Sequence, residues 1–258
     1  MSGVLDGKTA LLTGASAGIG LATARAMLNA GTSGVVINGR NAERADAAAQ
    51  SLKADFPDRT ITAAPADIAT PDGATKAVET ALAALGHIDI LVNSAGGNDM
   101  PALFHKLDIA TIPGMVGPAC NAIVLPCRAV LDHMSARGSG SIINVASDAA
   151  KIATPGESVI GGVMAFIAMF TRGLAIEAKR NGIRANCITP SIVRGTPLYD
   201  RLMEDPFAGK LFAKAEAMAH LGVVEAEELA DLAVFLASPA AARITGQAIS
   251  INGGISAA

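Results

Sequence analysis

The chain has 258 residues, of which 51% are hydrophobic, so it can bury one large core, and two separate domains are not expected. A formal net charge of -3 leaves no basic surplus to neutralise phosphates, which argues against nucleic acid or an anionic membrane as a partner and favours a small molecule. The three cysteines have neither the number nor the paired spacing of a disulfide or zinc framework, so we predict a cytoplasmic protein without a metal site.

Short apolar runs alternate with helical stretches along the whole chain. The first two strands are expected at residues 8–13 and 34–38, each followed by a helix, at 19–29 and 41–53. Further strands are expected, with helices between them, at 60–64, 88–93, 141–145, 184–188 and 248–251. The alternation predicts one doubly wound α/β domain of the Rossmann type over residues 1–258, with a parallel sheet of about seven strands, right-handed crossovers and helices on both faces.

Three glycines stand between the first expected strand and the first expected helix, in the run TGASAGIG at 13–20. Without side chains at these positions the backbone can approach a pyrophosphate, and the free N–H groups and dipole of the helix favour the anion. In a strand–turn–helix setting this pattern indicates phosphate binding rather than a purely structural turn. We therefore assign these residues to a dinucleotide site: Gly14, Ser16, Gly18, Ile19 and Gly20.

The second expected strand ends at Asn38-Gly39-Arg40, without the acidic residue that would accept a hydrogen bond from a ribose 2′-hydroxyl. Arg40 could instead bind a 2′-phosphate through two N–H donors. The sequence thus favours NADP over NAD, and the competing interpretation of Arg40 is an exposed loop arginine without a ligand.

Five motifs at consistent spacing resemble the short-chain dehydrogenase/reductase family: TGASAGIG at 13–20, NSAGG at 93–97, INVAS at 143–147, IRANCITPS at 183–191 and ITGQAISINGG at 244–254. The resemblance covers nearly the whole chain. It implies that Asp67 and Ile68 lie beside the adenine of the cofactor. It also implies that the sheet edge beside the cofactor is formed by Asn93, Ala95 and Gly96. The residues that it implies near the nicotinamide are Pro190, Ile192 and Thr196.

The chemistry that this resemblance implies is hydride transfer, with a tyrosine as general acid or base and a lysine one helical turn later that lowers the tyrosine pKa. The family serine, which polarises the substrate oxygen, corresponds to Ser147. Pro155-Gly156 fixes the register into an apolar helix expected at 158–179, and in this register Ile160 and Met164 occupy the tyrosine and lysine positions. Neither side chain can transfer a proton.

The helix before Ser147 also departs from the family pattern. The asparagine that helps to hold a water relay in the family corresponds to Ala119. Pro118 and Pro126 each remove an intrahelical hydrogen bond and clash with the preceding turn, so this helix is predicted to be kinked or broken at its start.

Four residues are candidates to replace the missing acid. Asp148 and Glu157 would have a raised pKa in a dry pocket, and are otherwise solvated loop carboxylates. His105 follows the NSAGG motif in a segment that borders the substrate pocket in the family, and is otherwise a surface histidine. Tyr199, the single tyrosine, lies in a segment at about 192–221 that the resemblance identifies as a lid, with a helical stretch over 202–221. It could reach the pocket when the lid closes, and the competing interpretation, which we favour, is that its ring covers substrate or packs the lid.

The apolar helix also bears on assembly, because in the family it packs against a partner subunit. Its apolar residues Val159, Val163, Phe166, Ile167 and Phe170 extend past the altered positions, and the resemblance implies a homodimer or homotetramer. Two functions remain open. One is an NADP-dependent oxidoreductase acting on a small carbonyl or alcohol with an atypical active site; the other is a catalytically silent NADP(H)-binding protein that serves as sensor, scaffold or partner subunit.

Overall fold

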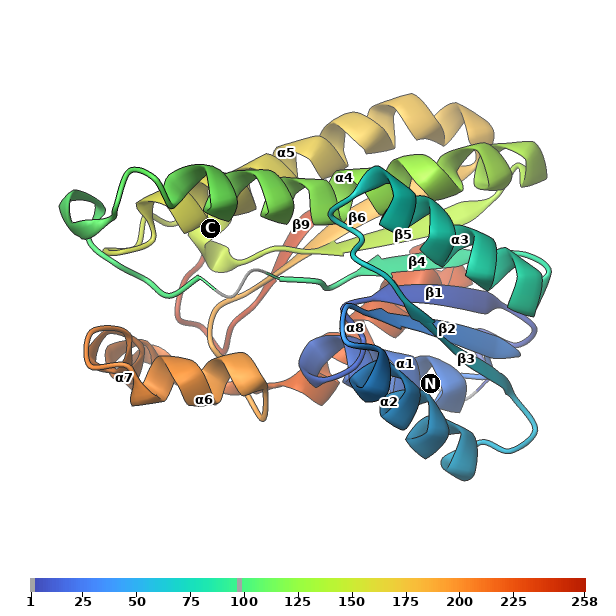
Figure 1. Cartoon of the computed structure of the whole chain (residues 1–258), viewed down its shortest axis with the longest axis horizontal. Helices are drawn as coiled ribbons and strands as arrows, with labels where there is room; N and C mark the ends of the chain where they lie inside the picture. Colours follow the sequence, from blue (N-terminus) through green and yellow to red (C-terminus); the bar gives the residue numbers. More distant parts are fainter. Residues whose placement is uncertain (1–2, 97–98) are drawn as a thin grey trace.

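The computed structural model describes residues 3–96 and 99–258, and its centre is one sheet of seven parallel strands (Figure 1). The spatial order β3-β2-β1-β4-β5-β6-β9 reverses at β1, which confirms the expected doubly wound α/β fold. The strands are β1 (Thr9–Thr13), β2 (Gly34–Gly39), β3 (Thr60–Pro65), β4 (Ile90–Asn93), β5 (Gly140–Val145), β6 (Ile183–Pro190) and β9 (Ala248–Ile251). Each begins and ends within two residues of its expected bounds.

Helices cover both faces of the sheet, as expected from the alternation (Figure 1). On one face lie α1 (Gly18–Asn29), α2 (Ala42–Asp55) and α8 (Ala226–Ala237); on the other lie α3 (Pro71–Leu85), α4 (Ile112–Arg137) and α5 (Ser158–Ala178). Neighbouring residues of β1 belong to two separate hydrophobic cores: Leu12 packs with the first group of helices and Leu11 with the second. Burial on both faces explains why inner strands such as β1 and β4 are nearly continuous apolar runs.

The predicted break in α4 is wrong, because the structure has one uninterrupted helix that contains both Pro118 and Pro126. Ile123, Pro126, Cys127 and Val130 are buried. Tertiary packing of this face therefore outweighs the lost backbone hydrogen bonds. By length and composition alone, α4 and the helical residues 158–181 could each cross a membrane; here they lie side by side along one face of the sheet (Figure 1).

Two short helices lie beyond the carboxyl ends of the strands, where the sequence predicted one helical stretch over 202–221 (Figure 1). They are α6 (Pro197–Glu204) and α7 (Ala208–Met218). Asp205 separates them, and its carboxylate accepts hydrogen bonds from the backbone of Phe207 and Ala208, which starts the second helix. The chain segments before and after these two helices pair as a small two-stranded sheet, β7 (Val193–Arg194) with β8 (Val224–Glu225).

Candidate functional site

A cavity of about 850 Å³ opens at the carboxyl ends of the strands. It runs from the β1–α1 turn, past the ends of β4, β5 and β6, to the inner sides of α5, α6 and α7. β1 lies where the strand order reverses, and open α/β sheets bind ligands at such a switch point. The cavity is therefore the candidate site.

The glycine turn forms one end of the cavity, where Gly14, Gly18, Ile19 and Gly20 line it. A Cβ on Gly14 would lie 2.5 Å from the Ala95 Cα, and Gly14 has φ +64. The N-terminus of α1 has no side-chain cap, so its backbone N–H groups remain available to an anion. This arrangement fits a dinucleotide pyrophosphate. Ser16 is not among the lining residues and approaches Gly39 instead.

The end of β2 differs from the sequence-based assignment. Arg40 is exposed and does not line the cavity, whereas Arg44, four residues later on α2, does. Arg40 precedes the Asn41 N-cap of α2 and so lies outside the helix, and sequence reasoning missed Arg44. Asp67 and Ile68 do not line the cavity either: Asp67 is exposed and caps its own turn, and Ile68 is a buried core residue.

Asn93 lies fully buried behind the cavity and holds the strand ends together. Its side chain accepts from Thr13 Oγ1 at 3.1 Å and donates to Asn144 Oδ1 at 3.0 Å. Asn144 in turn donates to Thr171 Oγ1 on α5 at 2.9 Å. These bonds join β1, β4, β5 and α5, and so position Ala95 and Gly96, which do line the cavity. Gly97, the last residue of the NSAGG motif, lies outside the described residues.

Pro190, Ile192 and Thr196 line the cavity beyond β6, in the segment expected to meet the nicotinamide. Thr196 donates from Oγ1 to the Val193 carbonyl at 2.9 Å and accepts from the Tyr199 backbone N at 3.2 Å. It is thus the N-cap of α6, and the same residue forms part of the cavity wall.

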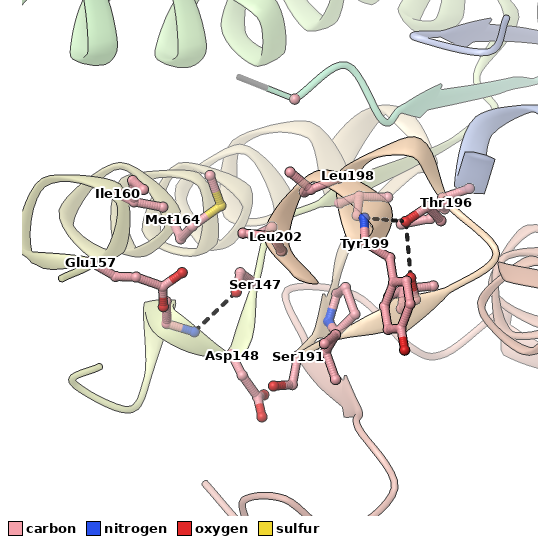
Figure 2. A pocket seen from close by; sticks show the side chains of 18 of the residues that line it. Ser147, Asp148, Glu157, Ile160, Met164, Ser191, Thr196, Leu198, Tyr199 and Leu202 are labelled. Carbon is pink, nitrogen blue, oxygen red and sulfur yellow. Dashed lines mark hydrogen bonds between the residues drawn. The ribbon is translucent and has the colours of Figure 1, made fainter. Parts of the chain in front are cut away.

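Ser147 follows β5 and lines the cavity. Its Oγ accepts from the backbone N of Ala149 at 3.2 Å, which caps a short turn at Asp148–Ala150 (Figure 2). Within the described residues this hydroxyl accepts one bond and donates none. Its proton can therefore be directed at a substrate oxygen in the cavity.

On α5, Ile160 and Met164 lie along the cavity wall, together with Val159, Val163 and Ile167 (Figure 2). These side chains are aliphatic or thioether groups, and none can exchange a proton at neutral pH. This wall of the cavity is therefore apolar where it faces Ser147.

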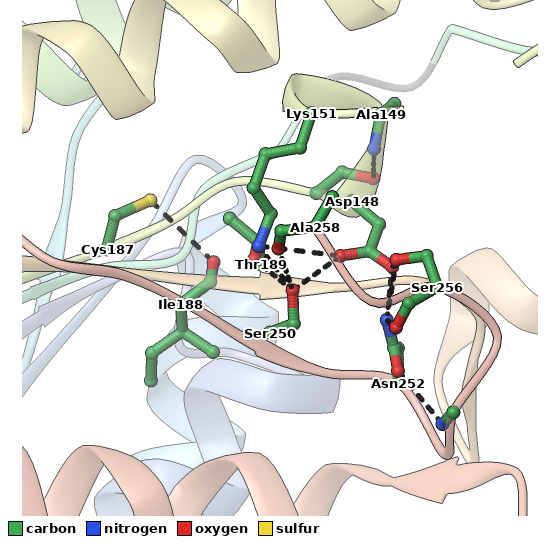
Figure 3. Close-up of polar contacts among 12 residues, drawn as sticks. Asp148, Ala149, Lys151, Cys187, Ile188, Thr189, Ser250, Asn252, Ser256 and Ala258 are labelled. Carbon is green, nitrogen blue, oxygen red and sulfur yellow. Dashed lines mark hydrogen bonds and ion pairs between the residues drawn. The ribbon is translucent and has the colours of Figure 1, made fainter. Parts of the chain in front are cut away.

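Asp148 is not the solvated loop carboxylate that one interpretation expected, because it is only 6% exposed. Its carboxylate accepts from Ser256 Oγ at 2.6 Å, from Ser250 Oγ at 3.0 Å and from Asn252 Nδ2 (Figure 3). Lys151 lies 4.0 Å away and also bonds to Ser250. Asp148 thus fastens the C-terminal segment to the loop that follows Ser147.

Glu157 precedes α5, is partly buried and lines the cavity. Burial raises the pKa of its carboxyl group, and a hydrogen bond with Thr154 lowers the pKa to a smaller extent.

Tyr199 also lines the cavity, but its hydroxyl donates to Glu216 Oε1 at 2.8 Å. Arg194 Nη2 donates to the same oxygen at 3.1 Å, so the hydroxyl links α6 to α7. These two hydrogen bonds lower the pKa of Glu216. His105 lies on an exposed turn, Phe104–Lys106, and is not among the lining residues.

Two cations on α6 and α7, Arg201 and Lys214, line the far end of the cavity. Sequence reasoning missed both, because helical periodicity shows which residues share a face but not that two short helices fold over a cavity. The C-terminal Ile255 was missed for a similar reason: it reaches the cavity only because Asp148 holds the tail.

Known proteins match the chain over most of its length. A family model described as short chain dehydrogenase matches residues 8–206. The gluconate 5-dehydrogenase of Gluconobacter oxydans is 33% identical over 253 residues, which cover 97% of this chain and 95% of that protein. A 3-oxoacyl-(acyl-carrier-protein) reductase of Chlamydia trachomatis is 33% identical over 258 residues, or 99% of this chain and 100% of that protein.

Solved structures agree with the fold at similar identity. A gluconate 5-dehydrogenase from Burkholderia cenocepacia, in complex with NADP and tartrate, has a TM-score of 0.87 and 31% identity over 97% of this chain and 96% of its own. A 3-ketoacyl-(acyl-carrier-protein) reductase from Brucella melitensis, complexed with NADH, has a TM-score of 0.86 and 29% identity over 98% of this chain and 100% of its own. The likeness therefore extends over nearly the whole chain.

Proposed function

Because the chain belongs to the short-chain dehydrogenase family, we propose that it is an NADP(H)-dependent oxidoreductase that acts on a small carbonyl compound or alcohol through an atypical active site. The observation that carries the proposal is one cavity shared by the glycine turn and Ser147. A dinucleotide held at the first would place its reactive ring near the second.

The cofactor would be held mainly by backbone. Gly14, Gly18, Ile19 and Gly20 offer N–H groups to the pyrophosphate, while Pro190, Ile192 and Thr196 border the nicotinamide end. Arg44, with Arg40 four residues before it, would bind a 2′-phosphate. The Burkholderia relative binds NADP and the Brucella relative NADH, so the arginines support the choice of NADP here. Ala95 and Gly96 would border the cofactor from the end of β4, with Asn93 buried behind them. Three residues that the sequence assigned to this site do not line the cavity: Ser16, Asp67 and Ile68.

The bound nicotinamide would supply or accept the hydride. Ser147 would donate its hydroxyl proton as a hydrogen bond to the substrate oxygen and so fix the carbonyl. Ile160 and Met164 stand, in our alignment, where the family has its tyrosine and lysine, so proton transfer needs another group. General acid catalysis contributes typically about 10²- to 10⁴-fold.

The lining also indicates the kind of substrate. An apolar wall on α5 faces Arg201 and Lys214 on α6 and α7, which favours a molecule with an apolar part and an anionic group. We propose that residues 192–221 act as a lid over it, with the two cations on the lid.

The outer faces of α4 and α5 support assembly into a homodimer or homotetramer. Val163 and Ile167 point inward, but Phe166, Met169 and Ile176 are 42%, 62% and 62% exposed. Phe166 stacks on Phe170 with ring centroids 6.2 Å apart. Several exposed large apolar side chains on one helix are typical of a subunit interface, and light scattering of the purified protein measures the resulting mass.

A second function is favoured by Ile160 and Met164 in the cavity wall: a catalytically silent NADP(H)-binding protein that acts as sensor, scaffold or partner subunit. One experiment separates the two. NADPH binding is titrated by calorimetry, a panel of carbonyl substrates is tested, and Ile160→Tyr with Met164→Lys is then introduced. Turnover by the unmodified chain supports the oxidoreductase. Binding without turnover, followed by activity in the double variant, supports the silent protein, and absence of NADPH binding contradicts both.

A further inference from the structure

The titratable and charged side chains that line the cavity differ in their hydrogen bonds and in their exposure to solvent. Asp148 accepts from Ser250 and Ser256, and the Tyr199 hydroxyl donates to Glu216. The others are exposed: Asp99, Arg44, Arg201 and Lys214. Among the described lining residues, Glu157 is left as the partly buried acid, and its carboxyl has one side-chain partner, Thr154.

Glu157 is also placed where a proton is needed. It is the N-cap residue of α5, three positions before Ile160, and both residues line the cavity. Figure 2 shows Glu157, Ile160 and Met164 along one wall of the pocket, with Ser147 and its hydroxyl beside them. The acid therefore borders the same space in which Ser147 would hold the substrate oxygen.

The loop that carries Glu157 is fixed from both sides. The carbonyl of Gly156 accepts from the Ala102 backbone N at 2.9 Å. Gly156 has φ +84, and a Cβ there would lie 2.5 Å from the Phe207 ring, so the backbone packs closely against the lid. Burial raises the pKa of Glu157, which keeps a larger fraction of the carboxyl protonated near neutral pH than in water.

We propose that Glu157 is the proton donor of the reaction and takes over the task of the missing tyrosine. In the reducing direction, hydride from a reduced nicotinamide dinucleotide forms the new C–H bond at the substrate carbonyl carbon. The C=O π electrons move to oxygen, the Glu157 O–H bond breaks, and an O–H bond forms on the substrate. The alcohol leaves, and the Glu157 carboxylate is reprotonated from solvent. In the oxidising direction the carboxylate accepts the proton.

This role rests on the proposed oxidoreductase function, and the test separates the two. Glu157→Gln keeps the shape and removes the acidic proton. With a carbonyl substrate that the unmodified chain reduces, we expect kcat to fall about 10²-fold or more, while the Kd of NADPH changes less than twofold. Glu177→Gln, an exposed carboxyl on the last turn of the same helix, is the matched control and should leave kcat unchanged.

The pH profile gives a second readout. Reduction needs the protonated acid, so kcat/KM for reduction should fall as pH rises through the Glu157 pKa, and oxidation should rise over the same range. Other titratable or charged residues also line the cavity: Asp99, Asp148, Tyr199, Arg44, Arg201 and Lys214. The pH dependence is therefore assigned to Glu157 only if it disappears in Glu157→Gln. In Glu157→Ala, added formic or acetic acid should restore part of the rate.

A third readout needs neither cofactor nor turnover. Infrared spectra of the ligand-free protein should show a protonated carboxyl band that persists above the usual carboxyl range and is missing in Glu157→Gln. An active unmodified chain with an equally active Glu157→Gln overturns the role of Glu157 and leaves the oxidoreductase intact. A chain that binds NADPH but reduces nothing overturns the oxidoreductase, and the role of Glu157 with it.

Discussion

The two ends of the cavity are built on different principles. At the β1–α1 turn the shape is made by backbone, since a side chain on Gly14 or Gly20 would overlap neighbouring main-chain atoms. Around Ser147 the chemistry depends on side chains, and Ile160 and Met164 fit the wall of α5 without disturbing the helix. A turn shaped by backbone tolerates little change, whereas a wall made of side chains can change its residues while the fold persists.

The largest effect is expected at the cofactor end. Gly14→Ala introduces a Cβ 2.5 Å from the Ala95 Cα at a residue with φ +64, so the turn must move. We expect the Kd of NADPH to rise about 100-fold or more, which is about 2.7 kcal/mol. Calorimetric titration measures this. Gly173→Ala on α5, where a Cβ would meet nothing within 4 Å, is the control and should bind NADPH normally.

The next largest effect is expected at Asp148, in the loop that follows Ser147. Asp148→Ala leaves Ser250, Asn252 and Ser256 without their buried acceptor, and hydrogen bonds to a charged group each contribute about 1.5–3 kcal/mol. We expect a loss of about 3 kcal/mol in the free energy of unfolding, measured in urea. Asp46→Ala, an exposed position on α2, should change it by less than about 0.5 kcal/mol. Equal losses of unfolding free energy in both variants would contradict the inference that Asp148 fastens the C-terminal segment.

Most of the fold and the glycine turn that lines the cavity could be predicted from sequence, because both leave local signals. Strands buried on two faces are continuous apolar runs, and Gly14, Gly18 and Gly20 mark the turn directly. The failures arise from contacts between distant segments. Pro118 and Pro126 stay in one helix because that helix packs on the sheet, and Asp148 is buried because the C-terminal segment folds over it. Neither contact has a local pattern.

A smaller effect separates the two arginines after β2. Arg44→Ala should raise the Kd of NADPH about tenfold and leave that of NADH within about twofold, because only NADPH carries the 2′-phosphate. Arg40→Ala should change the Kd of NADPH less, since Arg40 is exposed and outside the lining. Equal losses for NADPH and NADH in Arg44→Ala would show that this residue does not recognise the 2′-phosphate.

The smallest effect is expected at the link between α6 and α7. Tyr199→Phe removes the hydroxyl that donates to Glu216, at a cost of about 1 kcal/mol in unfolding free energy. The hydrogen bonds from Tyr199 and Arg194 lower the Glu216 pKa, so their stabilisation is present above the usual carboxyl pKa and is lost as pH falls through the lowered value. Unfolding in urea should therefore distinguish Tyr199→Phe from the unmodified chain at neutral pH and not in acid. Glu216→Gln should remove the same pH dependence. A difference that persists in acid would mean that the tyrosine stabilises the lid by packing and not through Glu216.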